Sequence, residues 1–382
     1  MNTYRLLTYM VFWSCLPAAA FAQHYHSFPH FVSGGGWASD IYLTNQGGQS
    51  VGGVQVSFFD DNGTPLTVSA NIGANSVFTL TMAAGETKSI QTVSSGTAVA
   101  GYVVVRFPSS ASITGSEILR YGDANATITQ VGVPLQSPFQ HYSFPVEIKT
   151  ASSVNTGVAL TNPVFGTTQV WQQDTVINLI RSDGTLRQRT IVRLAAGQHV
   201  ARFLDQLFPG VDNFAGTLSI SAPNLIGVLG LRLNGSVYAG VSINYGPVLG
   251  PFTQNAAPTS ESEPNNYKSQ ANALTGSGII GGTVSSSSDM DYFSFSGKRD
   301  DIVSFLLDTQ SITSYLDSVI RLEKADGTVV AENDQNGLLE QNDSFIQAVL
   351  PEDGTYYVRI VDYWGDGGFT YTYRLHVNLP AK

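Results

Sequence analysis

The sequence predicts an all-β protein built from three β-sandwich domains, the last of them jelly-roll-like. Only 13% of the 382 residues are charged, and the chain is rich in Gly (38 residues) and Tyr (17 residues) as well as in Thr and Val. This composition favours sheets over helices or disorder. Short alternating strands separated by turn residues recur along the chain, and its length suits two or three domains.

The first 22 residues have the pattern of a secretory signal peptide. Arg5 gives the positive start, residues 6–16 the apolar stretch, and residues 20–22 a small-residue cleavage pattern. The apolar run is too short to cross a bilayer, and no later segment is long and apolar enough to do so. Cleavage would remove Cys15, the only cysteine. We therefore expect a secreted protein with no membrane span and no disulfide.

Two internal repeats follow, at residues 24–138 and 139–250. IYLTN (41–45) matches VALTN (158–162), and MAAGETKSI (82–90) matches LAAGQHVAR (194–202) in the same order. A fixed order of matching segments is the signature of a duplication. We expect two homologous β-sandwich domains, with one helical turn near residues 200–208 of the second.

Three Asp-containing turns join pairs of expected strands. SFFDDNGTPL, RSDGTL and EKADGTVV each place Asp one or two residues before Gly, which tolerates positive φ. Asp61, Asp183 and Asp326 are therefore interpreted as turn residues rather than as ligands.

The charge is concentrated at the C-terminal end. Residues 259–382 hold 18 acidic and 8 basic side chains, whereas residues 1–258 hold 11 of each. An acidic region is a poor partner for nucleic acid and a suitable place for a divalent cation. Residues 251–260 are a linker by composition. Residues 261–382 then contain about eight short strands, as a jelly-roll-like sandwich requires.

Two clusters of oxygen-bearing side chains in this region suggest calcium, which takes six to eight hard oxygen ligands. In ESEPNN, Glu261 and Glu263 point the same way because residues i and i+2 share one side of an extended segment. Asp289 and Asp291 repeat this spacing at the start of a later strand. A cation would turn the mutual repulsion of four carboxylates into attraction. The alternative is a solvated linker beside a polar strand start.

The run ESEPNN…GGTV…DMDYFSF…LPEDGTYYVRI resembles the bacterial pre-peptidase C-terminal domain, which is related to the collagen-binding modules of clostridial collagenases. The resemblance spans about residues 261–378 and implies a calcium-stabilised β-sandwich appended to a secreted protein, often a peptidase. A backbone carbonyl near Phe369 would complete the shell. Asn266 and Ser288 stand where some members have Asp, which implies weaker binding or one ion instead of two. The metal ligands that the resemblance implies are Glu261, Glu263, Asn265, Asn266, Thr283, Asp289 and Asp291.

Two other segments were weighed as metal sites. The acidic loop 333–343 lacks the spacing of an EF-hand. The segment HYHSFPH (24–30) holds three of the six histidines, with His24 and His26 on one side, and could bind zinc or copper. The alternative is a plain N-terminal arm.

Aromatic residues of the C-terminal domain suggest a binding platform. Tyr357 is expected to face outward on its strand, and Tyr363 and Trp364 lie in the Gly-rich loop DYWGDGG. Aromatic faces suit stacking on an extracellular polymer, either protein or polysaccharide, or on a cell surface.

HExxH and P-loop motifs do not occur in the sequence. GQSVG (48–52) and GSGIIG (276–281) match GxSxG and GxGxxG in letters alone, because each lies among short expected strands and not at a strand-to-helix turn. We therefore expect a secreted, non-catalytic binding or adhesion protein with a calcium-stabilised C-terminal domain. Two alternatives stay open: a hydrolase or peptidase-associated protein whose active site lies in the first two domains, and a structural component of the cell surface.

Overall fold

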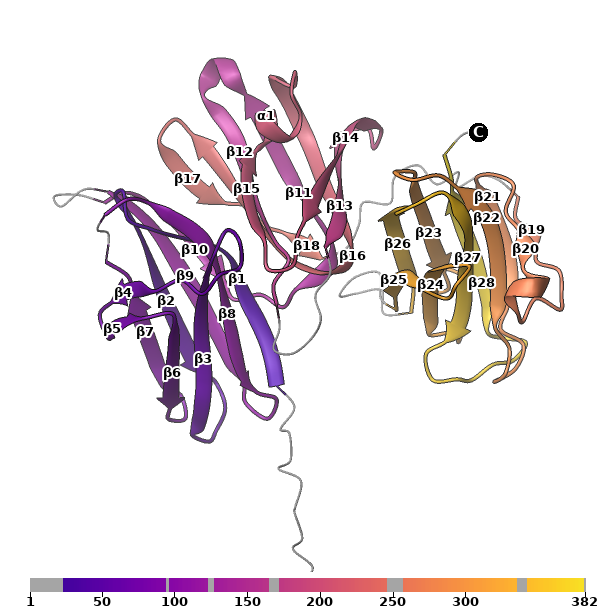
Figure 1. The fold of residues 1–382 in the computed structure, drawn as a ribbon, viewed down its shortest axis with the longest axis horizontal. Coiled ribbons are helices and arrows are strands. Elements are labelled where there is room, and N and C mark those ends of the chain that lie inside the picture. Colours follow the sequence, from indigo (N-terminus) through magenta and orange to yellow (C-terminus); the bar gives the residue numbers. More distant parts are fainter. Residues whose placement is uncertain are drawn as a thin grey trace, which may run out of the picture.

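The computed structural model describes residues 23–93, 96–122, 127–164, 172–245, 257–334 and 342–380. The expected signal peptide, Cys15 and most of the expected linker lie outside these ranges. Almost every described element is a strand, arranged in three β bodies that follow one another along the chain (Figure 1). The all-β prediction is confirmed. We call the three bodies the first (23–134), second (139–245) and third (257–380) modules.

The first module is a sandwich of two four-stranded sheets, ordered β1-β8-β3-β6 and β10-β9-β2-β7. Its core consists of side chains that alternate inward, as in β6, where Phe78, Leu80 and Met82 are buried and the residues between them are exposed. Its strands are β1 (Gln23–Ser33), β2 (Trp37–Asn45), β3 (Val51–Asp60), β4 (Val68–Ala70), β5 (Gly73–Asn75), β6 (Val77–Met82), β7 (Thr87–Gln91), β8 (Val99–Pro108), β9 (Ile113–Gly122) and β10 (Thr127–Pro134).

The second module repeats this order with one change. Its layers run β11-β16-β13-β14 and β17-β16-β12-β15, so the 22-residue β16 does the work of both β8 and β9. Residues 213–221 of β16 pair with β11, and residues 227–234 pair with β12. Its elements are β11 (Phe139–Lys149), η1 (Thr150–Ser152), β12 (Val154–Thr161), β13 (Gln173–Arg181), β14 (Leu186–Leu194), β15 (His199–Phe203), α1 (Leu204–Leu207), β16 (Asn213–Asn234), β17 (Val237–Gly240) and β18 (Asn244–Tyr245).

The continuity of β16 differs from the two separate sheets that we expected for this sandwich. In the first module a turn separates β8 from β9, and the Ala111 N–H donates to the Pro108 carbonyl there. The corresponding stretch of β16 stays extended and carries its chain from one layer into the other. The expected helical turn is present as α1.

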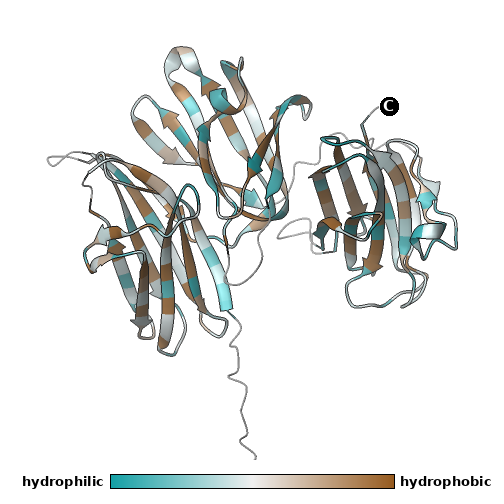
Figure 2. Ribbon diagram, in the orientation of Figure 1, coloured by the Kyte–Doolittle hydropathy of each residue, from teal (hydrophilic) through white to brown (hydrophobic). Residues whose placement is uncertain are grey.

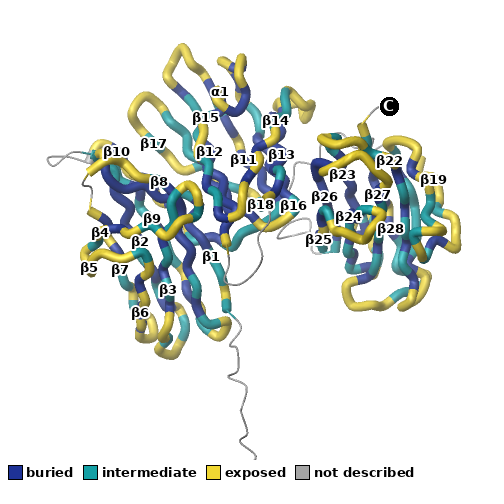
Figure 3. Tube along the Cα trace, in the orientation of Figure 1, coloured by how far each residue is buried: buried dark blue, intermediate teal, exposed yellow. Residues whose placement is uncertain are grey.

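The third module is a sandwich of two five-stranded sheets, ordered β19-β21-β28-β23-β26 and β20-β22-β27-β24-β25. Its buried core is formed by apolar residues of these strands. Brown, hydrophobic residues and dark blue, buried residues occur along the strands, whereas the loops are mostly exposed (Figures 2 and 3). Its elements are β19 (Thr259–Ser260), η2 (Lys268–Gln270), β20 (Asn272–Ala273), β21 (Gly278–Thr283), β22 (Asp291–Gly297), β23 (Ile302–Asp308), β24 (Ser318–Lys324), β25 (Val329–Asn333), β26 (Ser344–Val349), β27 (Gly354–Asp362) and β28 (Thr372–Asn378).

The second and third modules meet through hydrogen bonds between buried polar side chains and edge strands. His141 Nε2 lies 2.9 Å from the Phe345 carbonyl oxygen, and Asn178 Nδ2 donates to Gln347 Oε1 at 2.9 Å. Burial lowers the pKa of His141 to about 4, so this imidazole is neutral at neutral pH. Because β26 is the edge of its sheet, the second module covers a strand that would otherwise be open to pairing.

Two of the three expected turn aspartates do what the sequence predicts. Asp183 Oδ1 accepts from the Thr185 N–H, and Asp326 Oδ1 accepts from the Thr328 N–H, both at 2.9 Å. Asp61 lies in its turn, as predicted, but it is Asp60 Oδ1 that caps the turn by accepting from two backbone N–H groups. The Asp61 carboxylate points instead to the second module, where its Oδ1 lies 2.7 Å from His199 Nδ1.

Candidate metal centre

Three carboxylates of the third module converge at the base of β22. Glu261 and Glu263 come from the segment that follows β19, and Asp291 opens β22. Each supplies one carboxylate oxygen, and the three oxygens lie within 4.8 Å of one another. Oxygens bound to one calcium ion at 2.3–2.6 Å lie at most about 5 Å apart, so the three carboxylates fit a single ion.

Backbone contacts fix the first of these carboxylates. The Glu261 N–H donates to the Gly281 carbonyl at 3.0 Å, and Thr259 and Ser260 pair in parallel with β21. The Thr283 N–H, at the end of β21, then donates to Glu261 Oε1 at 2.6 Å. The chain entering the third module is thus held against the sheet up to the first carboxylate.

Asn265 lies among the three carboxylates and is fully buried. Its N–H donates to Glu263 Oε2 at 2.8 Å, and its side-chain amide lies 3.4 Å from Glu261 Oε2. With the amide turned over, its NH₂ group donates to Asp291 Oδ1 at 3.0 Å and to Glu263 Oε2 at 3.1 Å. Turning this amide the other way presents a carbonyl oxygen to a cation at the same place.

Tyr373 of β28 bridges two of the carboxylates. Its hydroxyl lies 2.6 Å from Glu261 Oε2 and 2.7 Å from Asp291 Oδ2. A phenol has one proton to donate, so it cannot satisfy two ionised carboxylates at once. One carboxyl must therefore carry a proton, or a cation must neutralise the pair.

The electrostatics of the cluster show how costly its charges are. Burial, with the added charge of Glu261, raises the pKa of Asp291 to about 8. Burial also raises the pKa of Glu261. Among the described residues, no ion pair joins Glu261, Glu263 or Asp291 to a Lys, Arg or His side chain. The cluster thus has carboxylates in excess and no built-in cation, the arrangement that favours a bound metal ion.

A cation has access to this cluster. A cavity of about 670 Å³ lies beside it, lined by Glu261, Glu263, Thr283 and Tyr373 together with residues of the entering chain. The cavity can hold water molecules, which commonly complete a calcium coordination shell.

The structure gives three of the other predicted ligands different partners. Asn266 Oδ1 accepts from the Met290 N–H at 3.2 Å, and Asp289 Oδ2 accepts from the N–H and hydroxyl of Ser285 at 2.6 and 2.7 Å. Thr283 contributes its N–H to Glu261. The structure therefore brings together Glu261, Glu263, Asn265 and Asp291. Tyr373 joins them. The alternation of residues in its strand indicates a core position and does not predict a contact with the carboxylates.

The three predicted platform residues are divided between two places. Tyr357 lies in the middle of β27, and the Lys268 ammonium sits 5.2 Å from its ring centroid. Tyr363 and Trp364 lie beyond the end of β27 with ring centroids 5.1 Å apart, and Trp364 is 75% exposed. Phe369, at 90% exposure, is a further exposed aromatic residue of the same Gly-rich loop.

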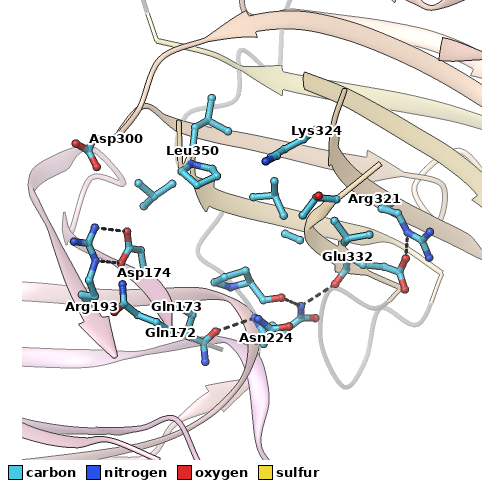
Figure 4. A pocket seen from close by; sticks show the side chains of 18 of the residues that line it. Gln172, Gln173, Asp174, Arg193, Asn224, Asp300, Arg321, Lys324, Glu332 and Leu350 are labelled. Atoms are coloured by element: carbon cyan, nitrogen blue, oxygen red, sulfur yellow. Dashed lines mark hydrogen bonds and ion pairs between the residues drawn. The ribbon is translucent and has the colours of Figure 1, made fainter. Parts of the chain in front are cut away.

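A larger cleft of about 1220 Å³ separates the second and third modules (Figure 4). Two acidic residues of its lining each pair with an arginine: Arg193 donates twice to Asp174, at 2.7 and 2.8 Å, and Arg321 pairs with Glu332. Because these charges are neutralised locally, the cleft lacks the excess of carboxylates that marks the cluster around Asp291.

Within the histidine segment at residues 24–30, the rings of His24 and His26 lie 6.2 Å apart between centroids, on one side of the strand as predicted. Both pack on Phe107, at 5.7 and 5.1 Å between ring centroids. His30 points to the second module, where its Nδ1 lies 3.1 Å from His199 Nε2.

Comparison with known protein families gives a match within the third module. Residues 289–361 match the bacterial pre-peptidase C-terminal domain family, whose members are found in secreted, peptidase-associated bacterial proteins. No curated protein matches the chain. No helix among the described residues has the length and apolar character needed to cross a membrane. Residues 289–361 of the third module thus match the bacterial pre-peptidase C-terminal domain family that the sequence motifs indicate.

Proposed function

We propose that the protein is a secreted, non-catalytic binding protein whose third module is stabilised by calcium. The observation that carries this proposal is the convergence of Glu261, Glu263 and Asp291 around Asn265, with no cationic side chain of the described residues paired to the three carboxylates. Calcium would neutralise the carboxylates and take the place of the proton that they must otherwise share.

The calcium site would act as a clamp on the chain that enters the third module. Thr259 and Ser260 already pair with β21, and the Glu261 N–H extends this contact to the Gly281 carbonyl. A cation would tie Glu261 and Glu263 to Asp291 of the other sheet. The clamp would thereby join the two sheets of the sandwich where the chain arrives from the second module. A protein without disulfides gains a cross-link in this way.

The binding role rests on the exposed aromatic side chains. Tyr363, Trp364 and Phe369 lie on one loop and are 54%, 75% and 90% exposed. Large aromatic side chains at this exposure are typical of surfaces that stack on a polymer or another protein. We propose this loop, rather than Tyr357, as the contact surface for an extracellular polymer or cell surface.

The first test is a calcium titration of the purified protein by calorimetry, with Glu261→Gln/Asp291→Asn as the variant. Extracellular calcium modules bind with Kd on the order of 10⁻⁴–10⁻³ M, and we expect the wild type in that range. The double variant should give no binding heat. Equal titrations for both proteins would remove calcium from the proposal.

The second test separates binding from the catalytic alternative. The protein is incubated with insoluble polysaccharides and fibrous proteins, and both pelleting and hydrolysis are measured. Pelleting that Trp364→Ala/Phe369→Ala abolishes supports the binding role. Hydrolysis that persists in this variant would favour an active site in the first two modules instead.

A further inference from the structure

The junction between the first and second modules brings together two histidines and an aspartate from three separate elements. His30 comes from β1, His199 opens β15, and Asp61 lies just after β3. The His30 Nδ1 and His199 Nε2 atoms are 3.1 Å apart, and their rings are separated by 5.2 Å between centroids. Two imidazole nitrogens from different modules thus face each other at the distance of direct contact.

This separation suits two ligands of one metal ion. At Zn–N distances of 2.0–2.1 Å, nitrogens on a tetrahedral ion lie about 3.3–3.4 Å apart, and at right angles about 2.9 Å apart. The observed 3.1 Å lies between these values. A metal ion could therefore replace the proton that lies between His30 Nδ1 and His199 Nε2 if the two nitrogens moved by a few tenths of an ångström.

Asp61 holds the His199 ring as a residue that hydrogen-bonds a metal-binding histidine would. Its Oδ1 lies 2.7 Å from His199 Nδ1, and its carbonyl accepts from the His199 N–H at 3.0 Å. A carboxylate on one ring nitrogen fixes the tautomer so that the other nitrogen presents its lone pair. The His199 side chain is 1% exposed whereas that of Asp61 is 59% exposed, so the pair reaches from the interior to solvent.

Two buried hydroxyl oxygens without partners lie near the histidine pair. Thr161 is opposite His199 in the β12–β15 ladder, and its Oγ1 makes no hydrogen bond. Ser27, three residues before His30, also has a buried Oγ without a partner. A Cβ atom built on Gly227 would lie 2.5 Å from Thr161 Oγ1 and 3.2 Å from Ser27 Oγ. Buried hydroxyls without a partner among the described residues are uncommon, and each such group calls for an explanation such as a bound ion or water.

The backbone around this junction is closely packed. The position of a Cβ on Gly63, whose φ is +78°, lies 2.6 Å from the Gly197 carbonyl oxygen. Gly197 is two residues before His199, and Gly63 is two residues after Asp61. The turns that carry two of the three residues are therefore held in contact, which keeps the site in shape before any ion arrives.

We propose that His30 and His199 form a binding site for a divalent transition-metal ion of the zinc and copper class, with Asp61 orienting His199. Such ions prefer imidazole nitrogen, whereas calcium prefers oxygen, so this site and the carboxylate cluster would take different metals. Because the two ligands belong to different modules, the ion would join the first module to the second. This proposal goes beyond the calcium clamp and does not depend on it.

The test is metal binding by the purified protein in excess calcium, with Zn²⁺ by calorimetry and Cu²⁺ by electron paramagnetic resonance. The wild type should bind one ion and show hyperfine coupling to two imidazole nitrogens. His199→Gln and His30→Gln should each lose binding, and Asp61→Asn should weaken it by about 10–100-fold, as outer partners do. The matched control is His24→Gln/His26→Gln, which removes the other two histidines of the same segment.

The variants keep the proposal testable even if one of them folds poorly. Asp61 is largely exposed, so Asp61→Asn should fold and still report on the site. Binding that the control variant loses and the His30 or His199 variants keep would overturn the proposal. Wild-type protein that binds neither Zn²⁺ nor Cu²⁺ would overturn it too and would leave the calcium proposal unaffected.

Discussion

Buried carboxyl groups occur in both the first and the third modules, and the two places deal with them differently. Glu117 of β9 is fully buried in the first module, and Ser39 and Asp40 of the adjacent strand β2 are its polar neighbours. Burial raises the pKa of Glu117 to about 8, and the Ser39 hydroxyl offsets this only in part. A single buried carboxyl can thus stay neutral by keeping its proton.

In the third module a single proton leaves negative charge uncompensated, because three carboxylates converge there. The module brings one oxygen from each of three carboxylates to within 4.8 Å of one another and offers them one phenol and one amide. Protonating all three would require the pKa of every one to exceed neutrality, and the cluster opens to a cavity that water can enter. The two places therefore differ in the number of carboxyl groups and in the access of solvent to them. One buried acid can keep its proton, whereas a cluster of carboxylates open to solvent suits a cation.

The largest effect should come from the lone carboxyl. The pKa of Glu117 is raised above the ordinary value of 4.5 in the folded state, so its contribution to stability is present at low pH and is lost as pH rises through about 8. We expect the free energy of unfolding of the first module to fall between pH 5 and pH 10 by on the order of 3–5 kcal/mol. Chemical denaturation at both pH values measures it.

Glu117→Gln should make this stability independent of pH, because Gln resembles the neutral acid. Glu86→Gln, at a partly exposed carboxyl of the same module, is the control and should leave the pH dependence as in the wild type. A Glu117→Gln protein that keeps the full dependence would show that the lone acid is not its source.

The next effect concerns the phenol in the cluster. Tyr373→Phe removes the donor shared by Glu261 and Asp291 and should cost about 1–3 kcal/mol in the presence of chelator. Calcium should recover part of this loss, because it would neutralise the same oxygens. Tyr371→Phe is the control, since Tyr371 packs against the core only in part. Equal losses with and without calcium would contradict a shared role.

A smaller effect distinguishes the two adjacent asparagines. Asn265→Ala removes the amide that lies among the carboxylates and should weaken calcium binding about tenfold, or about 1.4 kcal/mol. Asn266→Ala removes the acceptor for the Met290 N–H and should leave calcium affinity within about twofold. Calorimetric titration of both variants decides this, and the reverse order would show that the cluster binds calcium in another way.

The spacing of residues in the sequence was sufficient to predict those members of the carboxylate cluster that lie close together along the chain. Glu261 and Glu263 share a side as the i, i+2 rule requires, and the strand that begins at Asp291 meets them. Tyr373 was missed because it lies 82 residues after Asp291, and only sheet pairing brings it there. Local pattern alone could not show a partner supplied by the far edge of the fold.

The junction between the first two modules shows the same limit. Asp61 was interpreted as a turn residue, and the turn does exist, but Asp60 takes that role and leaves Asp61 free to contact His199. Both aspartates precede the same glycine, so local turn rules do not separate them. His30 and His199 likewise meet only because the modules pack together.

The measurement that tests the central claim most directly is thermal unfolding of the whole protein in millimolar calcium and in chelator. With Kd on the order of 10⁻⁴–10⁻³ M, calcium should stabilise the third module by about 0.4–1.4 kcal/mol. The Glu261→Gln/Asp291→Asn variant should be at least as stable as the wild type in chelator, because its repulsion is removed, and should not respond to calcium. A variant that responds to calcium as the wild type does would contradict the clamp.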